Sequence, residues 1–200
     1  MRAVWEKAAA RYPRGALRLR FSDNHDQLRA TGQFGLPAAL AASGLIFTLD
    51  GVPLLYNGME VGDTVESAAP ALFEKAPIQW GMAERRPQVT PFYQALAKLR
   101  RAHPAFTRGA VRWLGNDDER RVLSFERAAA GETIVVVVNL SSQPYAGVVK
   151  TEHGKYRDIT PEWRSSVPPP QAAPKAPPIR ELPAVALGPW EFRVFSRVKS

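Results

Sequence analysis

A short segment near the start of the chain gathers the kinds of side chain that act on polar substrates. Residues 21–29 read Phe-Ser-Asp-Asn-His-Asp-Gln-Leu-Arg, with two carboxylates, an amide, an imidazole and a guanidinium. Before it, Leu17, Leu19 and Phe21 alternate with arginines, which predicts a strand with one apolar face. Ligands of parallel α/β folds bind beyond the carboxyl ends of the strands, so this position predicts a polar-substrate site. The alternative is a polar turn in which an Asn or Asp side chain caps the next helix.

Other chemistries find less support in the residues. His25, His103 and His153 lie in unrelated segments, so no recognised metal-ligand spacing is present and no metal site is predicted. The chain holds no Gly-x-Ser-x-Gly motif, which argues against a Ser-His-Asp hydrolase. The absence of cysteine excludes thiol catalysis, disulfides and cysteine zinc sites.

The elements expected to position the polar segment alternate between helices and strands. A helix is predicted over 4–11, and a second helix begins near Pro37 and reaches the Asp50-Gly51 turn. A short apolar run over 52–56 predicts a buried strand that ends at Asn57-Gly58. A third helix is predicted with Thr90 as its cap, and it stops before Pro104. This order is typical of a parallel α/β fold.

The periodicity changes from helical to alternating after about residue 105. Strands are predicted over 111–114, 122–127, 133–139 and 190–195, with 135–138 as the centre of a buried strand. The proline-rich segment 161–183 predicts an extended loop, because proline lacks the N–H that a sheet needs. We therefore expect an α/β unit over 1–105 and an antiparallel β-sandwich domain over 106–200.

Composition narrows the class of protein further. The 200 residues are 45% hydrophobic and 23% charged, which is ordinary for a globular protein. The net charge of +8 comes from scattered arginine pairs without a basic stripe, so no nucleic-acid partner is predicted. No apolar stretch approaches the roughly 20 residues that cross a bilayer, and no membrane association is predicted. The compartment is left open.

Two motifs in order resemble the α-amylase family of glycoside hydrolases. Residues 21–26 resemble the Asn-His-Asp motif that ends the seventh strand of the family's barrel, and Gly-Val-Pro-Leu-Leu-Tyr-Asn-Gly-Met-Glu over 51–60 looks like the eighth-strand motif. Residues 77–80, the helix over 91–102 and the strand over 135–140 are similar to the family's last barrel helix and its C-terminal β domain. The resemblance implies the C-terminal portion of a (β/α)8 barrel, strands 7 and 8 with their helices, followed by that β domain.

The resemblance also implies roles for individual residues. Asp26 would be the aspartate that stabilises the transition state by holding hydroxyls of the distorted sugar, and His25 would donate hydrogen bonds to the same sugar. Asn24 and Arg29 would orient the loop or pair with carboxylates, with direct sugar contact as the lesser alternative. Asp63 would contact a neighbouring sugar.

Tyr56 and Glu60 are expected to brace the eighth strand and its loop. The implied substrate is an α-glucan such as starch or glycogen, or a maltooligosaccharide. The implied reaction is hydrolysis with retention. No cofactor is implied, although calcium is compatible with a longer parent enzyme.

Retaining hydrolysis also needs a nucleophile and a general acid about 5 Å apart. In the family these stand on the fourth and fifth strands, whose motifs the 200 residues do not contain. We therefore expect the chain to be inactive alone, as a fragment of a longer enzyme or as a chain that docks with a partner carrying the missing strands. A glucosyl or maltosyl transferase, a trehalose synthase-type isomerase and a noncatalytic carbohydrate-binding or assembly module are the alternatives.

Overall fold

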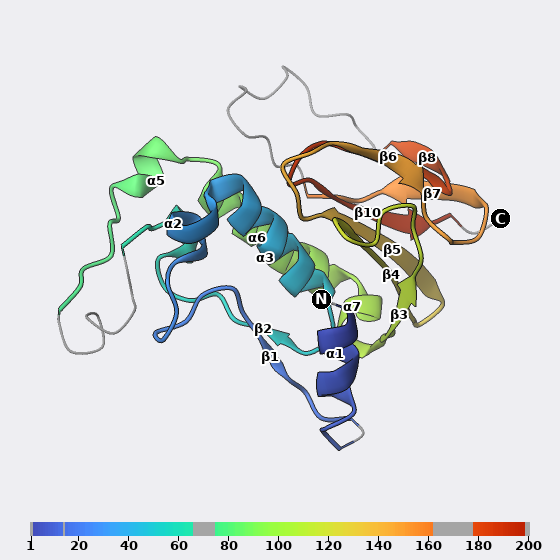
Figure 1. Ribbon diagram of the computed structural model, residues 1–200, viewed down its shortest axis with the longest axis horizontal. Coiled ribbons are helices and arrows are strands. Elements are labelled where there is room, and N and C mark those ends of the chain that lie inside the picture. The colour runs from blue at the N-terminus through green and yellow to red at the C-terminus, as the bar shows by residue number, and fades with distance from the viewer. Residues whose placement is uncertain (1, 14, 66–74, 162–177, 199–200) are drawn as a thin grey trace.

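The computed structural model describes residues 2–13, 15–65, 75–161 and 178–198. Helices and two short strands occupy one side of the molecule, and the remaining strands occupy the other (Figure 1). No described helix has the length and apolar character needed to cross a membrane.

The first part of the chain forms a parallel strand pair with helices. Its elements are α1 (Arg2–Ala9), β1 (Leu19–Arg20), α2 (Ala30–Phe34), α3 (Leu36–Thr48), β2 (Val52–Pro53), η1 (Met59–Val61), α5 (Met82–Arg85), α6 (Val89–Ala102) and α7 (Pro104–Arg108). Strands β1 and β2 pair in parallel, with Leu19 opposite Val52. The connection between them runs through α2 and α3, as the sequence pattern predicts for a βαβ unit.

Both parallel strands are shorter and more exposed than the sequence predicts. The predicted strands over 17–21 and 52–56 are only two residues long each, and five apolar side chains along these segments are exposed: Leu17 73%, Leu19 55%, Phe21 41%, Val52 46% and Leu55 41%. In the described part of the chain each of these strands has one neighbour only, so no further strand or layer covers the apolar face. The prediction of a buried strand over 52–56 is therefore wrong for Val52 and Leu55.

The helix boundaries follow the predicted signals with one exception. Helix α3 carries Pro37 in its first turn, as predicted. Helix α6 begins at Val89, and Gln88, which has no side-chain cap bond, occupies the cap position in place of Thr90. The Thr90 hydroxyl donates instead to the carbonyl of Glu60, at 2.7 Å. This bond ties the start of α6 to the loop after β2.

The second part of the chain is antiparallel. A six-stranded sheet has the order β3 (Ala110–Leu114), β4 (Val122–Ala129), β5 (Glu132–Asn139), β10 (Phe192–Arg197), β7 (Gly154–Asp158), β8 (Ile179–Leu182), and a smaller sheet pairs β6 (Tyr145–Val148) with β9 (Ala184–Leu187). Strands β3, β4, β5 and β10 match the predicted strands, whereas β6 to β9 were not predicted. Each of those four strands is only four or five residues long, which is too short for a clear periodicity in the sequence.

Two hydrophobic clusters meet at strand β5, whose residues 134–138 are completely buried. Ile134, Val136 and Val138 pack with the helices, while Val135 and Val137 pack with the smaller sheet. Alternate residues of a strand face opposite sides, so one strand contributes to both clusters. The predicted buried centre at 135–138 is confirmed.

The structure describes only the two ends of the proline-rich segment 161–183, which was predicted to be an extended loop. Residues 162–177 of that segment lie outside the described residues. Its end contains a strand, β8, which pairs antiparallel with β7. The prediction is wrong there because Pro178 and Pro183 flank the four strand residues and remove no N–H from within them.

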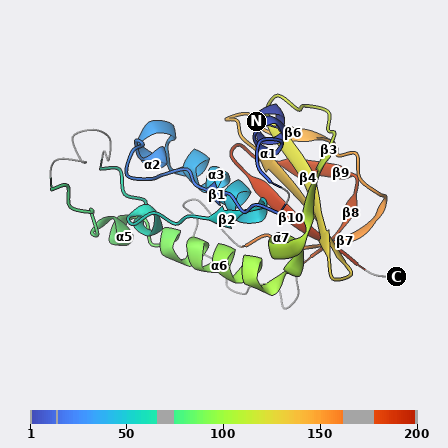
Figure 2. The same ribbon diagram turned by 90° about the horizontal axis from the view of Figure 1, so that it is seen from below.

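Helix α3 lies between the two parts and touches both. It contacts α6 and β2 on one side and β5 and β10 on the other, and Figure 2 shows α6 leading through α7 to the sheet. A Cβ atom on Gly44 would lie 2.6 Å from the Phe192 ring, so the glycine permits this close approach. The helices and the sheet therefore share one core.

A buried arginine of the sheet closes the end of α3. Arg127, 1% exposed, donates from Nη1 to the carbonyl of Thr48 at 2.7 Å and from Nη2 to those of Phe106 and Gly109. Burial, and the charge of nearby Arg100, lower the pKa of Arg127 to about 10. The guanidinium thus binds carbonyls at the C-terminal ends of two helices, α3 and α7.

Candidate active site

The polar segment forms a loop between β1 and α2, beyond the carboxyl end of β1. His25 and Asp26 lie on this loop with side chains 68% and 55% exposed. The His25 Nε2 atom is 3.4 Å from the nearer oxygen of the Asp26 carboxylate. An imidazole and a carboxylate therefore lie together in contact with solvent, where a polar ligand can reach both.

Asn24 shapes the backbone of the same loop. Its side-chain oxygen accepts a hydrogen bond from the N–H of Asp26 at 2.9 Å, which is the local pattern of an Asx turn. The polar-turn alternative thus describes the local backbone. It does not remove the functional interpretation, because the turn projects His25 and Asp26 outward.

Asp23 joins the two ends of the loop from beneath. Its side chain is 2% exposed, and its Oδ1 accepts from the Ser22 hydroxyl at 2.9 Å and from the Ala30 N–H at 3.3 Å. Burial raises the pKa of Asp23, although the two hydrogen bonds and the charge of Arg29 act in the opposite direction. The residues between Asp23 and Ala30 form a closed loop with one carboxylate at its base.

Arg29 connects this loop with the loop that follows β2. It is 5% exposed, and its guanidinium carbon lies 4.7 Å from the ring centroid of Tyr56. Its Nη2 is 3.6 Å from the Asp63 carboxylate, and its Nη1 is 3.9 Å from the Asp23 carboxylate. The predicted role of Arg29 as a partner of carboxylates agrees with these distances.

The loop after β2 leaves space for the Arg29 guanidinium at Gly58. Gly58 has φ +93°, and a Cβ atom there would lie 2.9 Å from Nη2 of Arg29. The Gly58 N–H donates to Oε2 of Glu60 at 2.7 Å. Tyr56 and Gly58 contact Arg29, and Glu60 contacts Gly58 within the loop and Thr90 of α6. These contacts are in keeping with the expected bracing role of Tyr56 and Glu60.

Asp63 lies deeper than the prediction of a sugar contact requires. Its side chain is 1% exposed, its Oδ1 accepts from the Val65 N–H at 2.9 Å, and its Oδ2 faces Arg29. Direct contact between Asp63 and a sugar stays a prediction, and the burial of the carboxylate favours a positioning role.

Two residues have roles that the sequence pattern did not indicate. Asp23 appears in the polar segment as one more carboxylate, and its contact with Ala30 depends on how the loop folds. Gly58 belongs to an Asn-Gly turn signal, but the approach of Arg29 comes from a residue far away in the sequence. Of these features, the sequence pattern indicates only the left-handed backbone at Gly58.

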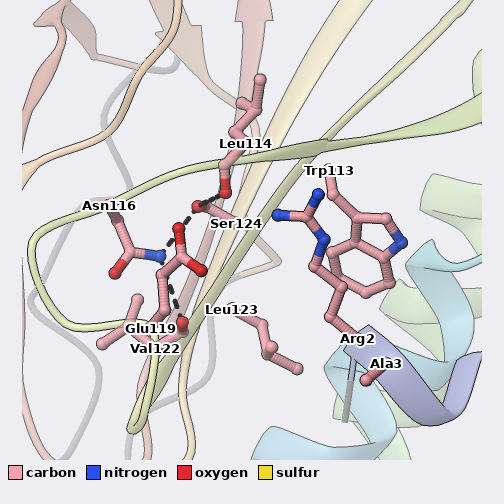
Figure 3. Close-up of a pocket in the computed structure, with 9 residues that line it drawn as sticks. All are labelled: Arg2, Ala3, Trp113, Leu114, Asn116, Glu119, Val122, Leu123 and Ser124. Atoms are coloured by element: carbon pink, nitrogen blue, oxygen red, sulfur yellow. Dashed lines mark hydrogen bonds between the residues drawn. The ribbon is translucent and has the colours of Figure 1, made fainter. Parts of the chain in front are cut away.

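Two small cavities of the described residues bear on the candidate site. One, of about 250 Å³, adjoins the candidate site and is lined by Leu28, Arg29, Gly32, Gln33 and Thr64. The other, of about 110 Å³, lies between α1 and the β3–β4 hairpin, with Arg2, Trp113 and Glu119 among its walls (Figure 3). No residue of the 24–29 loop lines this second cavity. No group of three or more metal-ligating His, Asp or Glu side chains is present among the described residues.

Comparison with known proteins relates this chain to one family. A family model described as the α-amylase C-terminal all-β domain matches residues 113–165. The α-amylase MalA of Haloarcula japonica is 31% identical over 147 residues, which cover 71% of this chain and 21% of that protein. This chain is a relative of the α-amylase family. It spans about a fifth of the length of that curated α-amylase.

Solved α-amylase family structures share the fold. An α-amylase from Geobacillus thermoleovorans, complexed with acarbose, superposes with a TM-score of 0.74 at 19% identity, over 99% of this chain and 42% of that one. A trehalulose synthase from Pseudomonas mesoacidophila gives 0.71 at 22% identity, over 98% and 46% of the two chains. The antiparallel sheets of this chain are thus the C-terminal β domain of an α-amylase-type fold.

Proposed function

We propose that these residues are the C-terminal part of an α-glucan-active glycoside hydrolase of the α-amylase type. In this proposal residues 1–105 complete a (β/α)8 barrel as its seventh and eighth strands with their helices, and 106–200 form the C-terminal β domain. The substrate is starch, glycogen or a maltooligosaccharide. Asp26 holds hydroxyls of the sugar that distorts in the transition state, and His25 donates hydrogen bonds to it.

The observation that carries this proposal is the exposed pair of His25 and Asp26 on the loop beyond β1. A carboxylate that stabilises an oxocarbenium-like transition state must reach the sugar from a held loop. Asp23 and Arg29 hold this loop from below, and the side chain of Asp26 extends from it into solvent. Relatives named as α-amylases add the substrate class.

The exposed apolar side chains of β1 and β2 support completion by further strands. Strands with free edges and an uncovered apolar face pair readily with additional parallel strands. The missing barrel strands would pair with the free edges of β1 and β2 and close the barrel over Leu19, Phe21 and Val52. Without them we expect the 200 residues to bind and hydrolyse α-glucans poorly or not at all.

The test is reconstitution. The 200-residue chain and a longer chain, in which six barrel strands precede it, are assayed with maltoheptaose, and the products are analysed by NMR for the anomeric configuration first released. The proposal expects hydrolysis with retention from the longer chain only. Release of the inverted anomer, or no activity on α-glucosides from a folded longer chain, would contradict it.

A transferase or isomerase is the second candidate, because a covalent glycosyl intermediate can pass to a sugar instead of water. The similarity in fold to a trehalulose synthase favours this second candidate. Repeating the assay with a tenfold excess of an acceptor glucose separates the two reactions. Transfer products that dominate over free sugar would assign the chain to a transferase or isomerase.

A further inference from the structure

We propose that Asp23 is a positioning residue that sets the place of Asp26 by holding both ends of the loop on which Asp26 lies. This inference rests on the proposed function of Asp26 and adds a residue to the machinery of that site. It concerns a carboxylate that has no route to the substrate, because its side chain is 2% exposed.

The contacts of Asp23 are placed at the two ends of the loop. The Ser22 hydroxyl, which donates to Asp23, lies where the chain leaves β1, and the Ala30 N–H lies where α2 begins. A single oxygen accepts from both groups. The loop that carries His25 and Asp26 is therefore closed at its base by one side chain, which limits how far its tip can move relative to β1.

The charge of Asp23 acts on the second anchor of the loop. Its other oxygen lies 3.9 Å from Nη1 of Arg29, and the Nε and Nη1 atoms of Arg29 are buried without a hydrogen-bond partner among the described residues. Arg29 is thus held by charge between Asp23 and Asp63 rather than by a full set of hydrogen bonds. Removing the carboxylate of Asp23 leaves the guanidinium with one anionic neighbour and shifts it toward Asp63.

The ionised form of Asp23 costs stability in the folded protein. Burial opposes the ionised carboxylate more strongly than its hydrogen bonds favour it, and this raises the pKa of Asp23. A group whose ionised form is disfavoured in the folded protein lowers stability at neutral pH. Such groups gather at functional sites, where a fixed geometry is worth more than its cost in stability.

The consequence for catalysis follows from geometry. A misplacement of the stabilising carboxylate by about 1 Å can reduce the rate about 100-fold. Loss of Asp23 should therefore lower kcat while the ground-state affinity for substrate changes little, because Asp26 acts mainly on the distorted sugar.

Two variants of Asp23 test this, with Asp118→Ala as the matched control. Asp118 is an aspartate of the β domain whose carboxylate pairs with Arg121 at the surface. Asp23→Ala removes both hydrogen bonds and the charge, whereas the amide oxygen of Asp23→Asn can still accept from Ser22 and Ala30. In the longer, active chain we expect Asp23→Ala to lower kcat about 10- to 100-fold with KM within about threefold. Asp23→Asn should restore at least part of that loss, and Asp118→Ala should match the parent.

A second measurement uses the 200-residue chain and does not depend on activity. The ¹⁵N heteronuclear NOE reports backbone order, and we expect it to fall for residues 24–29 in Asp23→Ala, with a changed Ala30 amide shift. Asp118→Ala should leave both unchanged. Full activity of Asp26→Ala would contradict the proposed function of Asp26. The NOE measurement would still test whether Asp23 orders the 24–29 loop. An ordered 24–29 loop in Asp23→Ala, or an unchanged kcat in that variant, would overturn the role of Asp23. Equal losses of kcat in both Asp23 variants would assign that role to its charge on Arg29.

Discussion

The guanidinium of Arg29 lies over the ring of Tyr56, with 4.7 Å between the guanidinium carbon and the ring centroid. This contact joins the two motifs that connect the chain to the α-amylase family, one from the loop after β1 and one from the loop after β2. A cation over an aromatic face in a desolvated setting contributes about 2 kcal/mol. The relative placement of the two loops, and with it the place of Asp26, depends on this buried joint.

Gly58→Ala should disturb the joint more than its backbone strain alone explains. The added Cβ would approach Nη2 of Arg29 to 2.9 Å and Cβ of Asp63 to 3.1 Å. Gly15→Ala is the matched control, since Gly15 has a similar φ of +86° and nothing lies within 4 Å of its added Cβ. Urea denaturation of both variants measures the difference.

We expect Gly58→Ala to lose about 1–3 kcal/mol more than Gly15→Ala, because it pays for overpacking in addition to the left-handed backbone. Equal losses in the two variants would show that Arg29 has room to move, and would contradict a rigid joint between the loops.

Arg127→Lys should destabilise the junction between α3 and the sheet. The three carbonyls of Thr48, Phe106 and Gly109 accept from the fork of one guanidinium, which an ammonium group cannot reproduce. The expected loss is about 2 kcal/mol or more in the free energy of unfolding, because buried acceptors lose their donors.

Arg112→Lys provides the control for Arg127. Arg112 is an arginine of β3, paired with Glu126 at an exposed position. Its substitution should change stability by less than about 0.5 kcal/mol. If chemical denaturation gave the same small change for Arg127→Lys, the guanidinium would have no special part in connecting the sheet to α3.

The free energy of unfolding should depend on pH in part through the ionisation of Asp50. Burial alone would raise the pKa of this carboxyl, but hydrogen bonds from Trp5 and Arg20, with the charge of Arg20, hold it below its usual value. Because the folded pKa lies below the unfolded one, the stabilisation is fully present above about pH 4 and is lost as the pH falls through the folded pKa.

Asp50→Asn removes that contribution. Comparing the free energies of unfolding of the parent and Asp50→Asn between pH 6 and pH 3 should show a difference that narrows below about pH 4. A difference that stayed constant across this range would mean that the ion pairs of Asp50 with Arg18 and Arg20 do not contribute.

The features predicted correctly from the sequence are those that depend on local patterns of residues. The uninterrupted apolar run at 134–138 matches a central strand that is buried on both faces, and Pro37 in the first turn of α3 follows from its fixed φ. The position of His25 and Asp26 beyond a strand was predictable from the alternating residues that directly precede them. Each of these depends on residues close together in the chain.

The features that sequence reasoning missed depend on contacts between distant residues. The burial expected for the strand over 52–56 needs a covering layer that the described residues do not supply. The partnership of Arg29 with Asp63, and the space that Gly58 leaves for it, arise only when the two loops meet. The role of Asp23 likewise depends on a loop closing onto the start of α2.

The central claim is that Asp26 stabilises the transition state of glycoside cleavage. The most direct measurement is kcat for maltoheptaose hydrolysis by the longer, active chain carrying Asp26→Ala, with Asp118→Ala prepared in parallel. Loss of an interaction made mainly in the transition state should reduce kcat by at least about 100-fold and leave KM within a small factor. Near-normal kcat in a folded Asp26→Ala protein would contradict the assignment.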